Sequence, residues 1–105
     1  MSKHLDEIKK YDPSADEAIV EKMVKTYRLV LSKRDSAYVA KSDPKELETV
    51  RKNFLQKKLG LTDSDEKLDA MIDEVMEQMK DDRMKERLTV YYLLAKKAGK
   101  LSVFS

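Results

Sequence analysis

The sequence has no cysteine and no tryptophan, and its 105 residues include one histidine, two glycines and two prolines. Without cysteine the chain can form neither a disulfide scaffold nor a thiolate-ligated zinc or iron–sulfur site. A single histidine cannot complete a histidine-based zinc site either. With both glycines at expected helix ends, a glycine-rich phosphate loop is also excluded. The composition fits a reducing compartment and one helix-rich domain.

Long hydrophobic runs are also missing. The longest one covers residues 90–95, whereas a membrane-spanning helix needs about 20 apolar residues. The first residues, Met-Ser-Lys-His-Leu-Asp-Glu, have no apolar core of the kind that a secretory signal requires. We therefore expect a cytoplasmic protein without a membrane partner.

Neither sign of charge predominates, because the chain has 22 basic and 20 acidic side chains and its net charge is +2. Such a balance does not favour nucleic acid as the partner. The distribution is uneven, since residues 63–82 hold nine acidic side chains and two lysines. Basic residues outnumber acidic ones before and after that segment. We expect these charges to be neutralised within a helical bundle, and a weak homo-oligomer that pairs them between copies is the alternative.

The apolar residues repeat at helical spacing, and no strand pattern competes with them. We predict an all-α fold, a compact bundle of four main helices with short helical turns, one of them through Ala40. The expected helices cover about 13–34, 44–59, 63–80 and 83–98. All of residues 1–105 are expected to form one domain, with a frayed N-terminal segment (1–11) and an apolar tail (100–105) that packs back.

Helix boundaries follow from caps and breakers. The first helix is predicted to start at Asp12-Pro13 or at a capping box over residues 14–17, and the second at Asp43-Pro44. Gly60 suits the left-handed residue that ends a helix, and Thr62 is expected to cap the next one.

Two further features concern the second half of the chain. The spacing of the apolar residues changes phase between Met79 and Met84, so a break between two helices is predicted at Asp81–Asp82. A single kinked helix is the alternative. The last helix is apolar on two faces and should lie at the centre, with Gly99 ending it.

No group of residues predicts catalysis. His4 lies near the terminus beside Lys3 and Asp6 and is expected to be a surface residue, because a catalytic histidine needs a positioned partner. Carboxylates, lysines and tyrosines are present but not arranged as a set. We therefore predict neither an enzyme nor a cofactor.

Two surfaces are candidates for binding. Methionine is frequent in residues 71–84, and flexible thioethers serve both irregular cores and protein-binding surfaces. Met76 lies off the centre of its helical stripe, so Met76, Leu101 and Phe104 form the predicted protein contact. The leading hypothesis is a non-catalytic helical module that binds an unknown protein.

The alternative is a weak nucleic-acid or ribonucleoprotein accessory that uses the basic face of the second helix. Its phosphate contacts would be Lys45, Arg51, Lys52, Lys57 and Lys58.

Residues 42–51, 57–61, 91–95 and 99–101 together carry a resemblance. The chain resembles a family of small bacterial proteins that is catalogued as a domain of unknown function, and the likeness runs from about Tyr11 to Leu101. The resemblance implies a bacterial cytoplasmic all-α domain. It implies no activity, ligand or functional residue.

Overall fold

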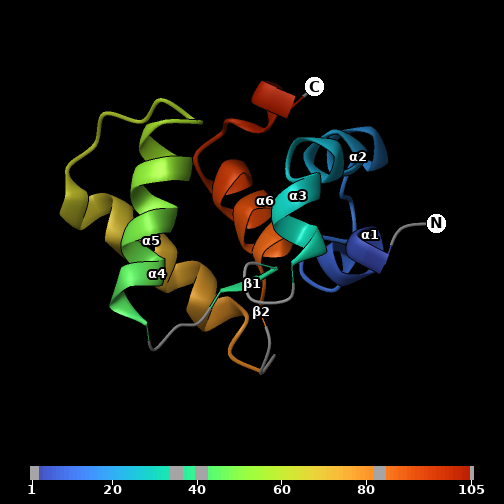
Figure 1. Cartoon of the computed structure of the whole chain (residues 1–105), viewed down its shortest axis with the longest axis horizontal. Coiled ribbons are helices and arrows are strands. Elements are labelled where there is room, and N and C mark those ends of the chain that lie inside the picture. The colour runs from blue at the N-terminus through green and yellow to red at the C-terminus, as the bar shows by residue number, and fades with distance from the viewer. Residues whose placement is uncertain (1–2, 34–36, 40–42, 82–84, 105) are drawn as a thin grey trace.

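The computed structural model describes residues 3–33, 37–39, 43–81 and 85–104, and these ranges form a mostly helical globule (Figure 1). The predicted helical fold is therefore confirmed. In chain order the elements are α1 (Lys3–Lys9), α2 (Glu17–Thr26), α3 (Arg28–Ser32), β1 (Tyr38–Val39), α4 (Pro44–Thr49), the π-helix η1 (Val50–Gln56), α5 (Asp65–Gln78), β2 (Lys85–Glu86), α6 (Arg87–Lys97) and the 3₁₀ turn η2 (Leu101–Phe104).

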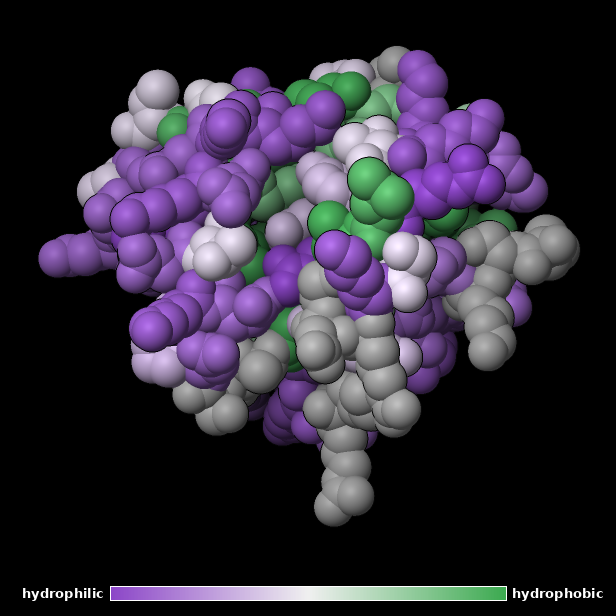
Figure 2. All heavy atoms as spheres, viewed as in Figure 1, coloured by the Kyte–Doolittle hydropathy of each residue, from purple (hydrophilic) through white to green (hydrophobic). Residues whose placement is uncertain are grey.

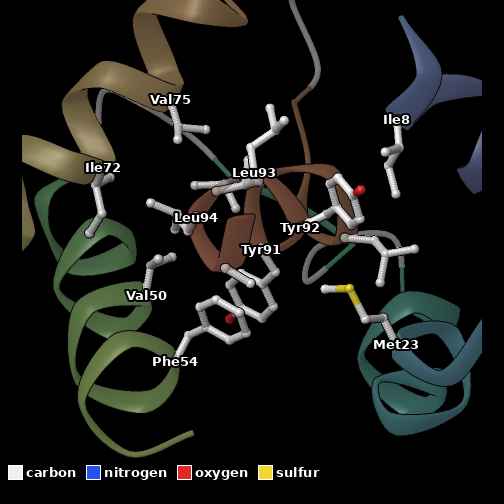
Figure 3. Close-up of a cluster of buried hydrophobic side chains, with 14 of the residues drawn as sticks. Ile8, Met23, Val50, Phe54, Ile72, Val75, Tyr91, Tyr92, Leu93 and Leu94 are labelled. Atoms are coloured by element: carbon white, nitrogen blue, oxygen red, sulfur yellow. The ribbon is translucent and has the colours of Figure 1, made fainter. Parts of the chain in front are cut away.

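Helix α6 lies at the centre, as its apolar faces predict. Every residue from Arg87 to Ala95 is buried. Helices α4 and α5 pack on one side of it, and α1 and α2 pack on the other (Figure 1). Figure 3 shows Leu94 directed towards Val50 and Ile72, while Tyr92 is directed towards Ile8. The core thus surrounds α6 and joins both halves of the molecule.

The predicted helix 13–34 is two helices, α2 and α3. Asp16 caps α2 by accepting a hydrogen bond from the Ala18 N–H at 2.9 Å, so both predicted starts lie too early. The helix breaks at Tyr27, whose φ of −106° and ψ of 20° leave the helical region. There the Tyr27 ring contacts the Tyr91 ring edge-on, with centroids 5.1 Å apart. The predicted end near Arg34 lies outside the described residues.

The N-terminal segment contains a helix that the sequence did not predict. From residue 3 to residue 9 it forms α1, which packs against α6 and α2. Leu5 and Ile8 are buried, because residues three apart share one face of a helix. This apolar pair ties the segment to the core.

The second predicted helix starts where expected, with Asp43 accepting from the Lys45 N–H at 3.0 Å and Pro44 in the first turn. From Val50 it continues as the π-helix η1, which the sequence did not predict. In an α-helix the nine steps from Val50 to Leu59 turn the chain through about 900°, which puts those two side chains on opposite faces. The wider winding, seen in the Leu59 N–H to Phe54 carbonyl bond of 2.9 Å, allows both to be buried.

The end of that helix follows the predicted pattern. Gly60 has a φ of 69°, in the left-handed region, and the Leu61 N–H donates to the Leu55 carbonyl at 3.0 Å. The next cap is Ser64, which accepts from the Lys67 N–H, instead of the predicted Thr62. Helix α5 consequently begins two residues later than expected.

A two-residue antiparallel ribbon replaces two predicted helical stretches. Tyr38 pairs with Glu86, and Val39 pairs with Lys85. The predicted turn through Ala40 is therefore strand over residues 38–39, and the predicted helix 83–98 begins only at Arg87. Helices α5 and α6 are separate, as the change of phase indicates. Asp82 and Met84 lie outside the described residues.

The C-terminal tail turns back over the core after Gly99, whose φ is also 69°. Phe104 in η2 is 2% exposed, and its ring stacks 6.3 Å from that of Phe54. Within the ranges that the structure describes, none of the helices combines the length and apolar character needed to cross a bilayer.

Candidate functional site

The predicted contact surface of Met76, Leu101 and Phe104 is not a surface. Met76 is fully buried, Phe104 is nearly so, and Leu101 is half-buried. The prediction for Met76 is wrong because this side chain follows Ile72 by four residues and shares its buried face. The methionine serves as core filling here.

The most exposed large hydrophobic side chain of the described residues lies on α3 instead. Leu29 is 80% exposed, and Val30 and Leu31 beside it are half-buried. Of the five residues of α3, all of which the structure describes, none is buried. Figure 2 shows hydrophobic side chains projecting over α3 from a mainly hydrophilic face. We call Leu29, with the flanking Val30 and Leu31, the α3 knob.

Three basic residues lie close to the α3 knob along the chain. Lys25, Arg28 and Lys33 are all exposed and lie within four residues of Leu29 along the chain. Glu21, the nearest described acidic residue before them, is two helical turns away. In space, Leu31 of the knob also lines a small pocket together with His4, Tyr38 and Glu86.

A groove runs between α4, η1 and α5. Its cavity volume is about 340 Å³, and the lining residues are Pro44, Leu47, Glu48, Arg51, Asp69, Ile72 and Asp73. Such a volume is at the small end of the roughly 300–1,000 Å³ seen for ligand sites. Three of the residues are apolar, and three are carboxylates against one guanidinium. We call this feature the α4–α5 groove.

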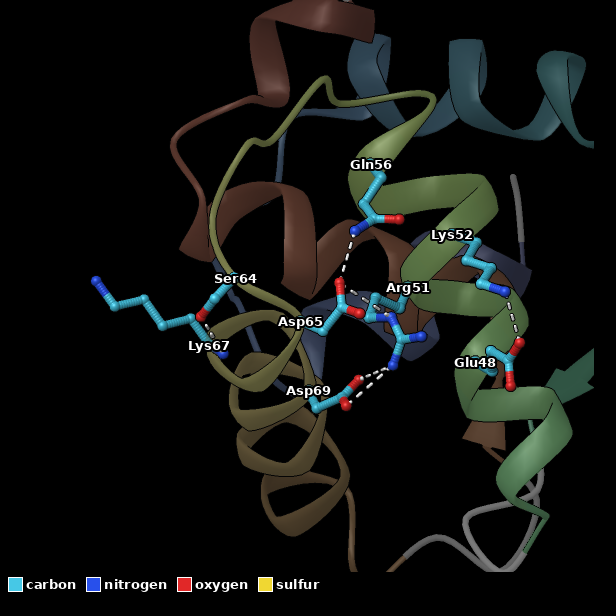
Figure 4. A network of polar contacts seen from close by, with 8 residues as sticks. All are labelled: Glu48, Arg51, Lys52, Gln56, Ser64, Asp65, Lys67 and Asp69. Carbon is cyan, nitrogen blue, oxygen red and sulfur yellow. Dashed lines mark hydrogen bonds and ion pairs between the residues drawn. The ribbon is translucent and has the colours of Figure 1, made fainter.

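Arg51 holds the two walls of the α4–α5 groove together (Figure 4). One guanidinium nitrogen, Nη1, donates to both carboxylate oxygens of Asp69 at 3.1 and 3.0 Å, and Asp65 lies 3.8 Å from Nε. The hydrogen bond to Asp69 raises the pKa of Arg51. This pair links η1 to α5 across the groove.

Several of the predicted phosphate-contact residues have partners within the chain. Arg51 is 15% exposed and bound to Asp69, and Lys52 lies 2.7 Å from Glu48. The Lys58 ammonium lies 5.3 Å from the centre of the Phe104 ring. Lys45 and Lys57 are exposed. The helix thus presents dispersed and partly neutralised charges in place of a continuous basic face.

A buried carboxylate joins the N-terminal and central helices, and sequence reasoning missed it. Asp12 is 4% exposed and accepts from the Tyr92 hydroxyl at 2.7 Å and the Ser14 hydroxyl at 2.8 Å, with the Lys96 ammonium 3.0 Å away. Burial raises the pKa of Asp12, but these three partners outweigh it and lower the pKa to about 2. Burial and the bond to Asp12 raise the pKa of Tyr92. This cluster holds α6 to the start of α2.

Two more polar contacts surround the ribbon. Arg87 is buried, pairs with Glu46 of α4 and donates to the Tyr91 hydroxyl at 3.0 Å. His4 is half-buried, and its Nδ1 lies 3.1 Å from the Glu86 carboxylate. These pairs join separate elements, α1 to β2 and α4 to α6, so their arrangement is structural.

Chemically, the described residues offer surfaces for contact. In the ranges covered by the structure, no three histidine or carboxylate side chains are placed to hold a metal ion. The side chains with large pKa shifts, Asp12, Tyr27 and Tyr92, do not line the α4–α5 groove.

Comparison with known proteins agrees with the resemblance seen in the sequence. A search of curated proteins gives no match. A family model described as "Protein of unknown function (DUF2853)" matches residues 3–102. Because that match spans nearly all of the 105 residues, the chain belongs to the DUF2853 family.

Proposed function

We propose that this chain is a non-catalytic, cytoplasmic protein-interaction module that contacts its partner through the α3 knob. The observation that carries the proposal is the 80% exposure of Leu29 on a helix with no buried residue. Exposing an isolated leucine costs little, but Leu29, with the half-buried Val30 and Leu31 beside it, leaves apolar surface that a partner can bury. Burial of apolar surface is the main driving force of protein association.

The absence of catalysis in this proposal is supported by the roles of the polar groups. Perturbed pKa values often indicate catalytic residues when they occur in a cleft. In this protein Asp12 and Tyr92 are buried and bonded to each other between helices. Cytoplasmic location is supported by the lack of cysteine.

The test is site-specific photo-crosslinking in cells that make the protein. A photoreactive amino acid replaces Leu29 in one variant and Val103, which is 41% exposed, in the matched control. We expect a discrete crosslinked product from position 29 and none from position 103. Failure to form a product at position 29, with both variants folded, would contradict the proposal.

A further inference from the structure

We infer that the turn η2 is a lid that opens while the rest of the fold stays closed, and that the space it uncovers binds a phenylalanine side chain of a partner protein. In the closed structure the Phe104 ring fills this space, against Tyr27, Phe54 and Lys58. We call this space the Phe104 site. It includes no residue of the α3 knob, so it is a second surface beyond the proposed function.

The Phe104 site suits an aromatic ring. The Phe104 ring is stacked on that of Phe54, with an angle of 13° between the planes and 6.3 Å between the centroids. The Tyr27 ring is tilted against it at 6.2 Å, and the Lys58 ammonium lies 5.3 Å from its centre. Ring–ring and cation–π attractions both need a π-system. A leucine in the same space would lose both attractions, so the site selects a ring.

The walls of the site are anchored in the central helix. Phe54 stacks on Tyr91 of α6 with centroids 4.0 Å apart, and the Tyr27 ring meets Tyr91 edge-on at 5.1 Å. Arg87 in turn donates to the Tyr91 hydroxyl at 3.0 Å. Neither wall depends on η2 for its position. The Phe104 site therefore keeps its shape when the Phe104 ring leaves it.

The lid itself buries little surface. Of the four residues of η2, all of them described, Phe104 alone is buried, Leu101 is half-buried, and Ser102 and Val103 are exposed. The Val103 N–H donates to the Lys100 carbonyl, and this local bond persists when the turn moves as a unit. Segments with little buried apolar surface open at a lower free energy than the whole fold. Opening of η2 should therefore precede unfolding of the helices.

Gly99 supplies the hinge. Its φ is 69°, and it directly follows the end of α6. Glycine moves between the left-handed and right-handed regions of the backbone without a steric penalty, so the chain can change direction here. Figure 1 shows η2 on the outside of the molecule beside the mark C, and it packs against α2 and α6. Its release leaves the helices around α6 in place.

The closed lid acts as an autoinhibitory contact. Phe104 is tethered next to its own site, so its effective concentration there is high. A partner's phenylalanine binds only the open state, and its apparent affinity is lowered in proportion to the fraction of open molecules. The strength of the lid contact therefore sets the affinity of the site for a partner.

Fluorine NMR of the full chain tests the lid. The chain has two phenylalanines, and both lie in the stacked pair, so fluorinated phenylalanine gives one signal on the lid and one beneath it. Saturation transfer should detect a minor state of about 0.1–10% in which Phe104 is exposed to solvent. Opening exposes little surface, so this population should hardly change with low urea. No minor state, or one that grows with urea as steeply as global unfolding, would overturn the lid.

A matched pair of lysine variants tests the clamp on the ring. Lys58→Met removes the ammonium from the Phe104 ring and should raise the open population about two- to fivefold. Lys57→Met removes the neighbouring exposed lysine and should leave that population unchanged. Both variants should keep the circular dichroism of the parent chain. An unchanged population in Lys58→Met would overturn the place of Lys58 in the site.

A small aromatic probe tests the binding. Full-length Phe104→Ala should bind N-acetylphenylalanine amide about tenfold or more tightly than the parent chain does, and N-acetylleucine amide more weakly, as the Phe54 fluorine signal reports. Val103→Ala, at an exposed position, is the control and should match the parent chain. Equal affinities for the two probes would overturn the aromatic site.

The parent chain gives the same answer without a core substitution. The phenylalanine probe binds the open state, so it should raise the minor-state population in proportion to its concentration. An unchanged population at high probe concentration would overturn the binding site even where Phe104→Ala does not fold.

Discussion

Helices α3 and α6 are similar in composition and opposite in environment. Three of the five residues of α3 are aliphatic, and α6 is apolar over most of its length. Yet α6 is buried from Arg87 to Ala95, whereas Leu29 of α3 is almost fully exposed. The difference lies in what surrounds each helix: α1, α2, η1 and α5 all contact α6. An apolar segment is therefore buried only where neighbouring elements cover it, and elsewhere it stays exposed.

The largest effect should come from α6. Leu94 is fully buried and is directed towards Val50, Ile72 and Val75 (Figure 3). Leu94→Ala should lower the free energy of unfolding by about 2–5 kcal/mol, because it removes apolar burial and leaves a cavity. Urea denaturation measures this loss. A loss below that of the α3 variant described last would contradict the comparison.

The next effect concerns the polar attachment of α6. Asp12→Asn keeps the shape of the side chain but removes its negative charge. That charge forms the ion pair with Lys96 and strengthens the hydrogen bond that the carboxylate accepts from the Tyr92 hydroxyl. We expect a loss of about 1–3 kcal/mol in the free energy of unfolding at neutral pH. Lys96→Met, which keeps Asp12, is the control and should cost less.

The same carboxylate gives a pH dependence with a defined sign. Its pKa is lowered from 3.8 to about 2 by folding, so the unfolded chain binds the proton more tightly. The stabilising contribution of Asp12 is therefore complete above about pH 4 and is lost as the pH falls through the folded-state pKa near 2. As the pH is lowered between those values, the midpoint temperature of thermal unfolding should fall less steeply for Asp12→Asn than for the parent chain. Parallel curves would contradict this assignment.

A smaller loss is expected at the end of α6. Gly99 has a φ of 69°, and a Cβ added there meets nothing within 4 Å. Gly99→Ala should therefore lower the free energy of unfolding by about 1 kcal/mol through backbone strain alone. Gly99→Asn should recover part of the loss, since asparagine tolerates the left-handed region better.

The smallest effect on stability is expected in α3. Leu29→Gln removes an exposed side chain, so the free energy of unfolding should change by less than about 0.5 kcal/mol. The denaturation midpoint, measured at low protein concentration where copies are apart, tests this. A large loss would show that the turn belongs to the core after all.

The helical fold could be predicted because caps and periodicity are local signals. Asp43, Pro44 and Gly60 act as their residue types predict. The burial of Met76 was also within reach, since it follows Ile72 by one helical turn. The apolar pair Leu5 and Ile8 similarly carried a signal for α1.

Other features depend on contacts between distant residues and have no local signal. Asp12 and Tyr92 are 80 residues apart, so the cap residue expected from Asp12-Pro13 is instead part of a buried cluster. The ribbon has two residues in each strand, and the alternation of a strand cannot be recognised over so short a length. The α3 knob and the α4–α5 groove likewise arise from which elements the fold leaves uncovered.

The central place of α6 also has a consequence for biosynthesis. Helices α1 to α5 all precede α6 in the chain, so they emerge from the ribosome before the helix on which most of them pack. Isolated helices of this length are marginal in water. The apolar faces that pack on α6 can therefore be buried only once α6 has itself left the ribosome, so completion of the core is a late step of folding.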